Sequence, residues 1–329
     1  MLEINLKDVV SEIKKHKAKI IAIQIPEGLK TKALEISSEI EKKAKVQTII
    51  FTDPCFGACD LADVKSKIVG ADLLVHFGHT KFYNPKIDTI FVPLKVKLKK
   101  KDLEKVISKL ADALLNENAK KVALCGTIQY AEYFDFLKKE LKKSNIEVFI
   151  GKGNITEHGQ VLGCNYSAVK NVENKADTIV YFGDGMFHPL GVWFAVDKNV
   201  IIVDPIENKV KILENERDSF LRKRFAQIEI AKKAKTFGIL VTTKTGQMKS
   251  KKAFELKKLI ESKGKKSFIL VSDLIKPEYL LGMKIDALVN TACPRIGVDD
   301  FSYFKIPILN PKELEITLGK RKWENYELE

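Results

Sequence analysis

One ten-residue pattern occurs twice in the chain, as GADLLVHFGH at residues 70–79 and as KADTIVYFGD at residues 175–184. In each copy an Asp precedes an apolar run that is typical of a buried strand, and a glycine follows the run. A shorter relative, KIDALVN, occupies residues 284–290. A motif that recurs about every 100 residues indicates a repeated domain, because the units of a solenoid are much shorter.

Each copy is accompanied by three more short apolar runs, separated by helical or turn segments, as in a parallel α/β sheet. These runs lie at residues 20–25, 46–51 and 88–93, at 121–127, 146–151 and 199–205, and at 237–243, 266–271 and 306–311. We therefore expect an α/β fold of three homologous small domains, arranged with pseudo-threefold symmetry around a central site. Each domain should hold a mostly parallel four-stranded sheet flanked by helices.

The expected domain boundaries are residues 1–97, 98–208 and 209–329. The third domain should open with a long charged helix at about residues 209–235, whose apolar positions would pack across the second and third domains. The alternative is a single doubly wound sheet with long insertions, which the internal repeat disfavours.

The composition is that of a folded globular protein, with 45% hydrophobic and 30% charged residues among 329. No apolar run approaches the roughly 18 residues that span a bilayer, so no membrane partner is expected. The first residues lack the apolar core of a signal peptide, which favours the cytoplasm. In that compartment cysteines stay reduced, and the odd count of five suits metal ligation better than a disulfide framework.

The net charge of +14 raises the possibility of nucleic-acid binding. Most lysines, however, alternate with acids and apolar residues, as at residues 99–105 and 138–143. That spacing is typical of solvated helix faces, so we expect no direct nucleic-acid contact, although the charge would help to dock an acidic macromolecule. A basic RNA- or ribosome-associated binding protein with incidental cysteines is the alternative from another class.

Three cysteines follow predicted strands in three different units. Cys59 lies in DPCFGACD, Cys164 in VLGCNY and Cys293 in NTACPR. Because the carboxyl ends of parallel strands are where α/β folds bind ligands, we expect the three thiols to meet in space. Three cysteine ligands would leave one iron of a [4Fe–4S] cluster open to hold a substrate.

The other two cysteines are expected to have different roles. Cys125 lies inside an apolar strand and should simply pack there. Cys55 is crowded by Pro54 and Phe56, which favours a supporting role. A compact Cys-x3-Cys-x2-Cys loop is excluded, because its third position is Ala62.

Together with LVHFGHT at residues 74–80, the three cysteine motifs resemble the archaeal radical enzyme of diphthamide biosynthesis, the 2-(3-amino-3-carboxypropyl)histidine synthase family. The resemblance covers essentially the whole chain. It implies a [4Fe–4S] cluster held by Cys59, Cys164 and Cys293. It also implies that S-adenosylmethionine is cleaved to methylthioadenosine and a 3-amino-3-carboxypropyl radical, which adds to an imidazole carbon of one histidine of translation elongation factor 2. A homodimer and an electron donor are implied as well.

A second enzyme hypothesis is quinolinate synthase, another family with three α/β domains around a three-cysteine cluster. It would bind dicarboxylates and would need several cationic groups at the cavity. The GACD and ACPR contexts of Cys59 and Cys293 resemble the diphthamide enzyme more closely.

Residues that hold the methionyl carboxylate and amine should lie on neighbouring strand-end turns. The candidates are Arg295, Gly246, Gln247, Gly183, Asp184 and Gly185. Purely structural roles stay open for them: a salt bridge for the arginine, tight turns for the glycines and a helix cap for the glutamine.

Histidines form a further group of candidates. His76 and His79 flank Gly78 at the end of the third strand of the first unit, and His188 lies in the matching region of the second, where they would donate protons in the cavity, guide the target imidazole, or only complete turns. His158 is expected to be a turn residue satisfied by the backbone, and His16 to lie on the surface of the first helix.

Overall fold

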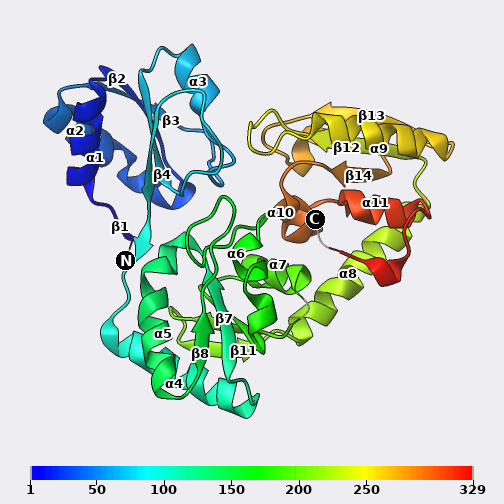
Figure 1. Cartoon of the computed structure of the whole chain (residues 1–329). Coiled ribbons are helices and arrows are strands. Elements are labelled where there is room, and N and C mark those ends of the chain that lie inside the picture. Colours follow the sequence, from blue (N-terminus) through cyan, green and yellow to red (C-terminus); the bar gives the residue numbers. More distant parts are fainter. Residues whose placement is uncertain (1, 197, 328–329) are drawn as a thin grey trace.

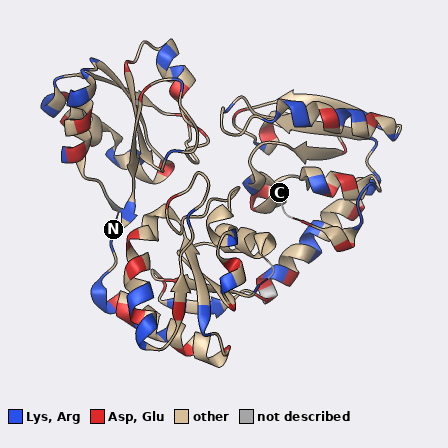
Figure 2. Cartoon of the chain, viewed as in Figure 1, with Lys and Arg blue, Asp and Glu red and all other residues tan. Residues whose placement is uncertain are grey.

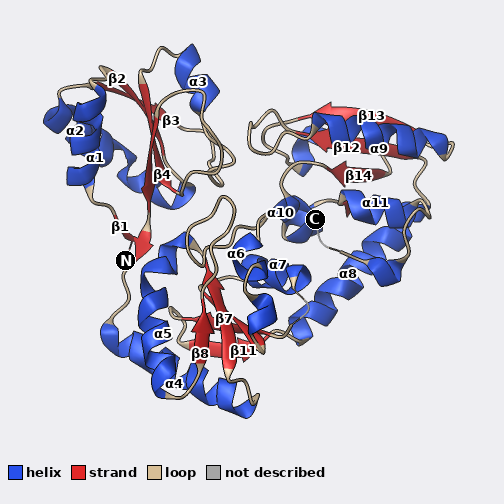
Figure 3. Cartoon of the chain, viewed as in Figure 1, coloured by secondary structure: helices blue, strands red, loops and turns tan. Residues whose placement is uncertain are grey.

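The computed structural model describes residues 2–196 and 198–327 of the chain. Three sheets, each with its own helices, are arranged around a common centre, with the loops that follow the strands pointing inward (Figure 1). Helices cover the faces of the sheets (Figure 3). The expected fold of three α/β domains is therefore confirmed.

The first domain is a four-stranded parallel sheet with the order β3-β2-β4-β5. Its strands are β2 (Ile20–Gln24), β3 (Gln47–Phe51), β4 (Leu73–Gly78) and β5 (Thr89–Pro93), and its helices are α1 (Leu6–His16), α2 (Ala33–Ala44) and α3 (Asp63–Ile68), with a 3-10 turn at Glu27–Lys32. A separate two-stranded ribbon pairs β1 (Leu2–Glu3) antiparallel with β6 (Lys95–Val96).

The second domain repeats the same order and adds one strand at the edge, giving β11-β10-β9-β7-β8. Its strands are β7 (Lys121–Gly126), β8 (Glu147–Phe149), β9 (Thr178–Phe182), β10 (Val200–Asp204) and β11 (Lys209–Ile212), and its helices are α4 (Lys100–Asn116), α5 (Phe134–Lys143), α6 (Ser167–Lys170) and α7 (Phe187–Ala195), with 3-10 turns at Ile128–Tyr133 and Glu173–Lys175. The added β11 runs antiparallel to β10, so this sheet has five strands where four were expected.

The third domain has the order β13-β12-β14-β15, again fully parallel. Its strands are β12 (Thr236–Val241), β13 (Lys266–Val271), β14 (Ala287–Asn290) and β15 (Ile308–Leu309), and its helices are α8 (Asn215–Lys232), α9 (Ser250–Ser262), α10 (Pro294–Val298) and α11 (Pro311–Thr317), with 3-10 turns at Pro277–Leu280, Asp300–Tyr303 and Trp323–Asn325.

The expected helix over 209–235 is wrong in its first part, because Lys209–Ile212 forms β11 and completes the second sheet. The alternation of Lys209, Val210, Lys211 and Ile212 is a strand pattern that the charge of the segment obscured. Helix α8 begins only at Asn215, and it runs from the second domain to the third (Figure 1).

The repeated Asp has a structural role that is the same in all three domains. The carboxylate of Asp72 accepts hydrogen bonds from the backbone N–H groups of Lys19 and Ile20 at 2.8 and 2.9 Å. Asp177 does the same for residues 120 and 121, and Asp286 for residues 235 and 236. Each Asp thus fastens the start of its domain's first strand to the start of the third, which explains why the motif recurs.

Charge is distributed along the helices, with Lys and Arg interspersed among Asp and Glu on their outer faces (Figure 2). This agrees with the solvated helix faces that the spacing of the lysines predicted. None of the helices among the described residues is both long and apolar enough to span a membrane.

Candidate metal centre

The Cys59 loop lies over the carboxyl edge of the first sheet and is fixed there by Gln24, the last residue of β2. The Gln24 side-chain amide donates to the Asp60 carbonyl at 2.7 Å and accepts from the Ala62 N–H at 3.0 Å. The third domain holds the same loop from the other side, where the Gly246 N–H donates to the Cys59 carbonyl at 3.1 Å. Gln247 Nε2 donates to the Cys59 Sγ at 3.2 Å.

Only a glycine fits at position 246, because a side chain there would collide with Cys59. A Cβ at that position would lie 2.6 Å from both the Cα and the carbonyl oxygen of Cys59. Those are backbone atoms that cannot rotate away, so any larger residue would push the two domains apart.

The Cys164 turn belongs to the long segment between β8 and α6, which folds back onto the end of β7. The backbone N–H of Val161 donates to the Gly126 carbonyl at 2.8 Å, which brings the segment to the carboxyl edge of the second sheet. Leu162 and Asn165 then exchange two backbone hydrogen bonds, at 2.9 and 3.0 Å, and the tight turn that they close presents Cys164.

Cys293 follows β14 and occupies the N-cap position of α10. Asn290 holds this turn by donating to the Cys293 carbonyl at 2.8 Å and accepting from the Ala292 N–H at 3.1 Å. Cys59 and Cys164 follow the second strands of their sheets, whereas Cys293 follows the third strand of its own. The three thiols are therefore contributed one per domain, but not from equivalent positions.

The three predicted cysteines line a single cavity of about 290 Å³. Burial raises the pKa of the Cys59 thiol above its ordinary value. Burial, together with the nearby Cys59 and Cys164 thiols, raises the pKa of Cys293 to about 12. Burial thus keeps these thiols neutral in the absence of a metal, whereas a bound metal would deprotonate the thiols that coordinate it. This all-sulfur donor set, with the Gln247 N–H on one sulfur, fits an iron–sulfur cluster held by three cysteines.

The other two cysteines do not line this cavity. Cys125 is fully buried in β7, where it packs in the core as predicted. Cys55 is also buried, and burial raises its pKa to about 12. Its sulfur lies within 4.8 Å of ring nitrogens of His76 and His79, a group that could hold a metal ion.

Side-chain contacts near the cavity join the first domain to each of the other two domains. Thr80 of the first domain and Gln160 of the second are joined through Oγ1 and Nε2 at 3.0 Å. Lys244 of the third domain forms an ion pair of 2.7 Å with Asp60 of the first, and both side chains are nearly buried. Sequence reasoning missed this pair, because 184 residues separate its members.

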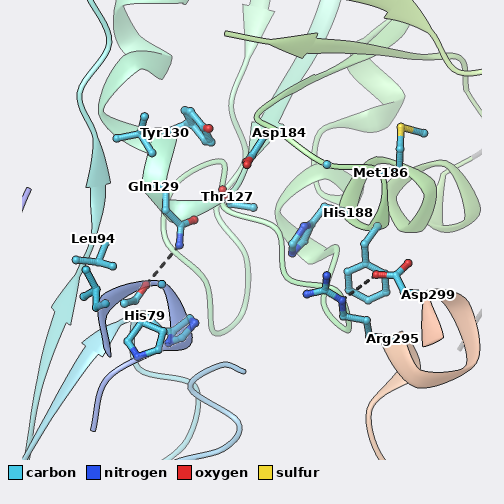
Figure 4. A pocket seen from close by; sticks show the side chains of 17 residues that line it. His79, Leu94, Thr127, Gln129, Tyr130, Asp184, Met186, His188, Arg295 and Asp299 are labelled. Carbon is cyan, nitrogen blue, oxygen red and sulfur yellow. Dashed lines mark hydrogen bonds and ion pairs between the residues drawn. The ribbon is translucent and has the colours of Figure 1, made fainter. Parts of the chain in front are cut away.

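A larger cavity of about 640 Å³ adjoins the cysteine cavity, and His79 and Arg295 are among the residues that line both. In Figure 4, His79 and Leu94 lie on one side of this larger cavity, and His188 and Arg295 on the other. Arg295 forms an ion pair with Asp299 at 2.8 Å, and its guanidinium lies over the ring of Phe187.

The remaining residues predicted to bind S-adenosylmethionine are placed differently from one another. Gln247 lines the cysteine cavity, while Asp184 and Gly185 line the larger one. Gly246 lies behind Cys59, and Gly183 is buried at the end of β9, where its N–H donates to the Val203 carbonyl. Direct binding by each of these residues stays a prediction.

Histidines divide into cavity residues and structural residues. His79 and His188 line both cavities, whereas His76 is fully buried behind His79. His158 donates from Nε2 to the Ile150 carbonyl at 2.8 Å, which confirms its structural role. His16 lies at the end of α1 near Glu12.

The fold and the site together define a three-domain α/β protein in which each domain contributes one thiol to a common centre. A model of the family described as "Putative diphthamide synthesis protein" matches residues 25–328, and the chain belongs to this family. It is 35% identical to 2-(3-amino-3-carboxypropyl)histidine synthase of Pyrococcus horikoshii, over 99% of this chain and 93% of that protein. It is 32% identical to the enzyme of the same name from Methanocaldococcus jannaschii, over 94% of this chain and 87% of the other.

Solved structures agree with these relatives. The crystal structure of Dph2 from Pyrococcus horikoshii with a 4Fe-4S cluster superposes with a TM-score of 0.91 at 34% identity, and it covers all of this chain and 94% of its own. The structure of the same protein described without mention of the cluster gives the same values.

Proposed function

We propose that this chain is a 2-(3-amino-3-carboxypropyl)histidine synthase, a transferase that moves the 3-amino-3-carboxypropyl group of S-adenosylmethionine to a histidine ring. The acceptor that we propose is a histidine of translation elongation factor 2, which makes the reaction the first step of diphthamide synthesis. The observation that carries the proposal is the meeting of Cys59, Cys164 and Cys293, one per domain, in a single cavity. The names of the two archaeal relatives support the activity.

We assign the three thiols as ligands of a [4Fe–4S] cluster, since a related structure is described with such a cluster. When bound, the cluster supplies the single electron that opens a carbon–sulfur bond of the sulfonium. The residues of the chain then decide which bond opens by orienting the substrate. Arg295 is available to pair with the methionyl carboxylate, because its guanidinium lines the cavity and is only partly covered.

The proposed partners follow from the same family membership. We propose that the enzyme acts in the cytoplasm as a homodimer, takes its electron from a separate donor and docks elongation factor 2 over the larger cavity. A protein histidine needs an open approach, and the larger cavity is the more open of the two. The net charge of +14 favours an acidic docking partner.

The experiment that tests this function is an anaerobic incubation of the cluster-loaded chain with dithionite and S-adenosylmethionine, followed by identification of the nucleoside product. We expect methylthioadenosine, and we expect its formation and the bound iron to be lost in Cys59→Ala, Cys164→Ala and Cys293→Ala. Cys125→Ala is the matched control and should keep its iron, because that thiol lies in the core.

Other products would contradict the proposal in distinct ways. 5′-Deoxyadenosine would mean that a different carbon–sulfur bond faces the cluster. No nucleoside from an intact cluster would favour a quinolinate synthase-like reaction, and a chain that takes up no iron would exclude both enzymes.

A further inference from the structure

Gln24 fixes the protonation of a buried pair of histidines. Its Nε2 donates to the Asp60 carbonyl at 2.7 Å, and its Oε1 accepts from the Ala62 N–H at 3.0 Å, so the amide can adopt only one orientation. The same Oε1 lies 2.9 Å from Nδ1 of His76. Because an amide oxygen can only accept, His76 must carry its proton on Nδ1.

The proton on His76 in turn fixes His79. Burial lowers the pKa of His76 to about 3, so the ring is neutral and its Nε2 has a lone pair. This Nε2 lies 2.9 Å from Nδ1 of His79, which must therefore be the donor. Burial also lowers the pKa of His79 to about 4, so its Nε2 is left unprotonated.

The free nitrogen of His79 is available at the junction of the two cavities. Among the described residues none makes a hydrogen bond to His79 Nε2, and the side chain lines both the cysteine cavity and the larger one. In the reaction proposed above, the reactive carbon is generated beside the thiols, and the target imidazole arrives through the larger cavity. The two substrates must then meet beside His79.

The chemistry of the product requires a proton acceptor at this meeting point. A 2-(3-amino-3-carboxypropyl)histidine has a carbon–carbon bond where the imidazole had a ring C–H bond, so that C–H bond must break. The electron that opened the carbon–sulfur bond returns to a one-electron acceptor such as an oxidised iron–sulfur centre. A proton is left over from the ring carbon.

We propose that His79 accepts this proton at Nε2, with Gln24 and His76 as positioning residues that hold it in the accepting tautomer. The inference rests on the proposed function. A weak base suffices, because loss of the proton restores the aromatic ring of the product. The protonated His79 keeps its donor bond to His76 and then releases the proton to the open cavity.

His188 is the competing acceptor, since it also lines both cavities. Burial lowers the pKa of His188 to about 4, as it does for His79, and the smaller effects of Arg295 and Asp184 on His188 oppose each other, so the pKa does not distinguish the two rings. The ring of His188 is stacked on Tyr181 at 6.4 Å, with no hydrogen bond that sets its tautomer among the described residues. His79 is therefore the better acceptor.

The first test needs no cluster. Histidine-selective ¹⁵N NMR of the full-length chain near neutral pH reports the tautomer of each ring. We expect both His76 and His79 to be protonated on Nδ1 only, and Gln24→Leu to abolish this fixed state while His158 stays unchanged. A His79 ring that carries its proton on Nε2 would overturn the proposal. So would tight binding of Co²⁺ or Zn²⁺ between Cys55, His76 and His79, because the metal would replace the bridging proton.

The second test follows the fate of the cleaved substrate. In His79→Gln, the yield of modified elongation factor 2 per methylthioadenosine should fall about 10²-fold, the scale of a lost general base. Deuterium on the target ring carbon should slow the residual transfer in this variant, because breaking that bond has become limiting. His16→Gln, on the surface of α1, is the matched control and should keep the wild-type yield.

The two proposals fail in different ways. A wild-type chain that forms no methylthioadenosine contradicts the proposed function. A His79→Gln chain with an unchanged yield per methylthioadenosine and no isotope effect overturns the role of His79 alone, as does an isotope effect that appears only in His188→Gln.

Discussion

The side-chain amide of Gln247 donates a hydrogen bond to the sulfur of Cys59 at 3.2 Å, although the two residues belong to different domains. This bond stabilises negative charge on the sulfur and lowers the pKa of Cys59, against the larger effect of burial. The third domain therefore contributes a hydrogen bond to the sulfur of Cys59, a proposed ligand in the first domain, as well as its own cysteine.

We expect Gln247→Leu to make the reduction potential of the bound cluster more negative. Hydrogen bonds to cluster sulfurs raise the potential, because they stabilise the more negative reduced state, and the variant lacks the donor. The measurement is an anaerobic redox titration followed by electron paramagnetic resonance. Gln129→Leu is the matched control: Gln129 lines the same cavity, but its amide donates to the Gly78 carbonyl instead of a sulfur. Equal shifts in both variants would contradict the assignment.

Gly246→Ala should reduce the iron content of the reconstituted chain. The new Cβ would lie 2.6 Å from backbone atoms of Cys59, so the loops must separate and carry the thiol out of reach of the shared centre. Gly28→Ala is the control, because a Cβ there meets nothing within 4 Å. Iron and sulfide analysis after anaerobic reconstitution distinguishes the two, and a Gly246→Ala chain with full iron content would show that the domains tolerate the separation.

Local sequence patterns were sufficient to predict the repeated sheets and the three thiols. The Asp-strand motif at Asp72 and Asp286 makes its contacts within one domain, and each cysteine follows a recognisable strand. Partners that are distant in the sequence were not predictable. No local pattern joins Gln24 to His76 or Lys244 to Asp60, because those pairs form only when strands or whole domains come together.

Strand β11 was missed for a different reason. Two of its four residues are lysines, which gave the segment the composition of the charged helix that follows it. The alternation with Val210 and Ile212 was the available signal, but four residues are too few to outweigh the longer helical pattern.

Asp286→Asn should destabilise the protein near neutral pH and have less effect in acid. Two backbone N–H groups lower the pKa of Asp286 below its ordinary value, so its contribution to stability is present above that ordinary value and is lost as the pH falls through the folded pKa. Urea unfolding at pH 7 and near pH 3 measures the free energy of unfolding of wild type and variant. The difference between the two should be smaller near pH 3 than at pH 7. Asp112→Asn, at an exposed position on α4, is the control and should change the free energy of unfolding only slightly at both pH values. If Asp286→Asn lowered the free energy of unfolding by the same amount at both pH values, the proposed role of the Asp286 charge would be contradicted.

Arg224 is the buried cation that joins α8 to the third sheet. Its guanidinium binds the Glu313 carboxylate at 2.5 and 2.8 Å and donates to the Gly297 and Ile308 carbonyls at 2.6 and 2.7 Å. Arg224→Met fills part of the volume but leaves a buried carboxylate without its counter-charge, which should cost about 3–5 kcal/mol of unfolding free energy.

The double variant Arg224→Met/Glu313→Gln separates loss of the ion pair from loss of packing. The neutral amide can still accept from the Asn310 N–H through its oxygen and can donate from its NH2 group to the Tyr326 hydroxyl, so no uncompensated charge remains. We therefore expect the double variant to be more stable than Arg224→Met alone in guanidinium unfolding. If it were less stable, the cost of the single change would arise from the unsatisfied carbonyls of Gly297 and Ile308 and not from the buried charge. Helix α10, which contains Gly297, begins directly after Cys293. That result would therefore also predict faster backbone amide hydrogen exchange in the Cys293 turn of Arg224→Met.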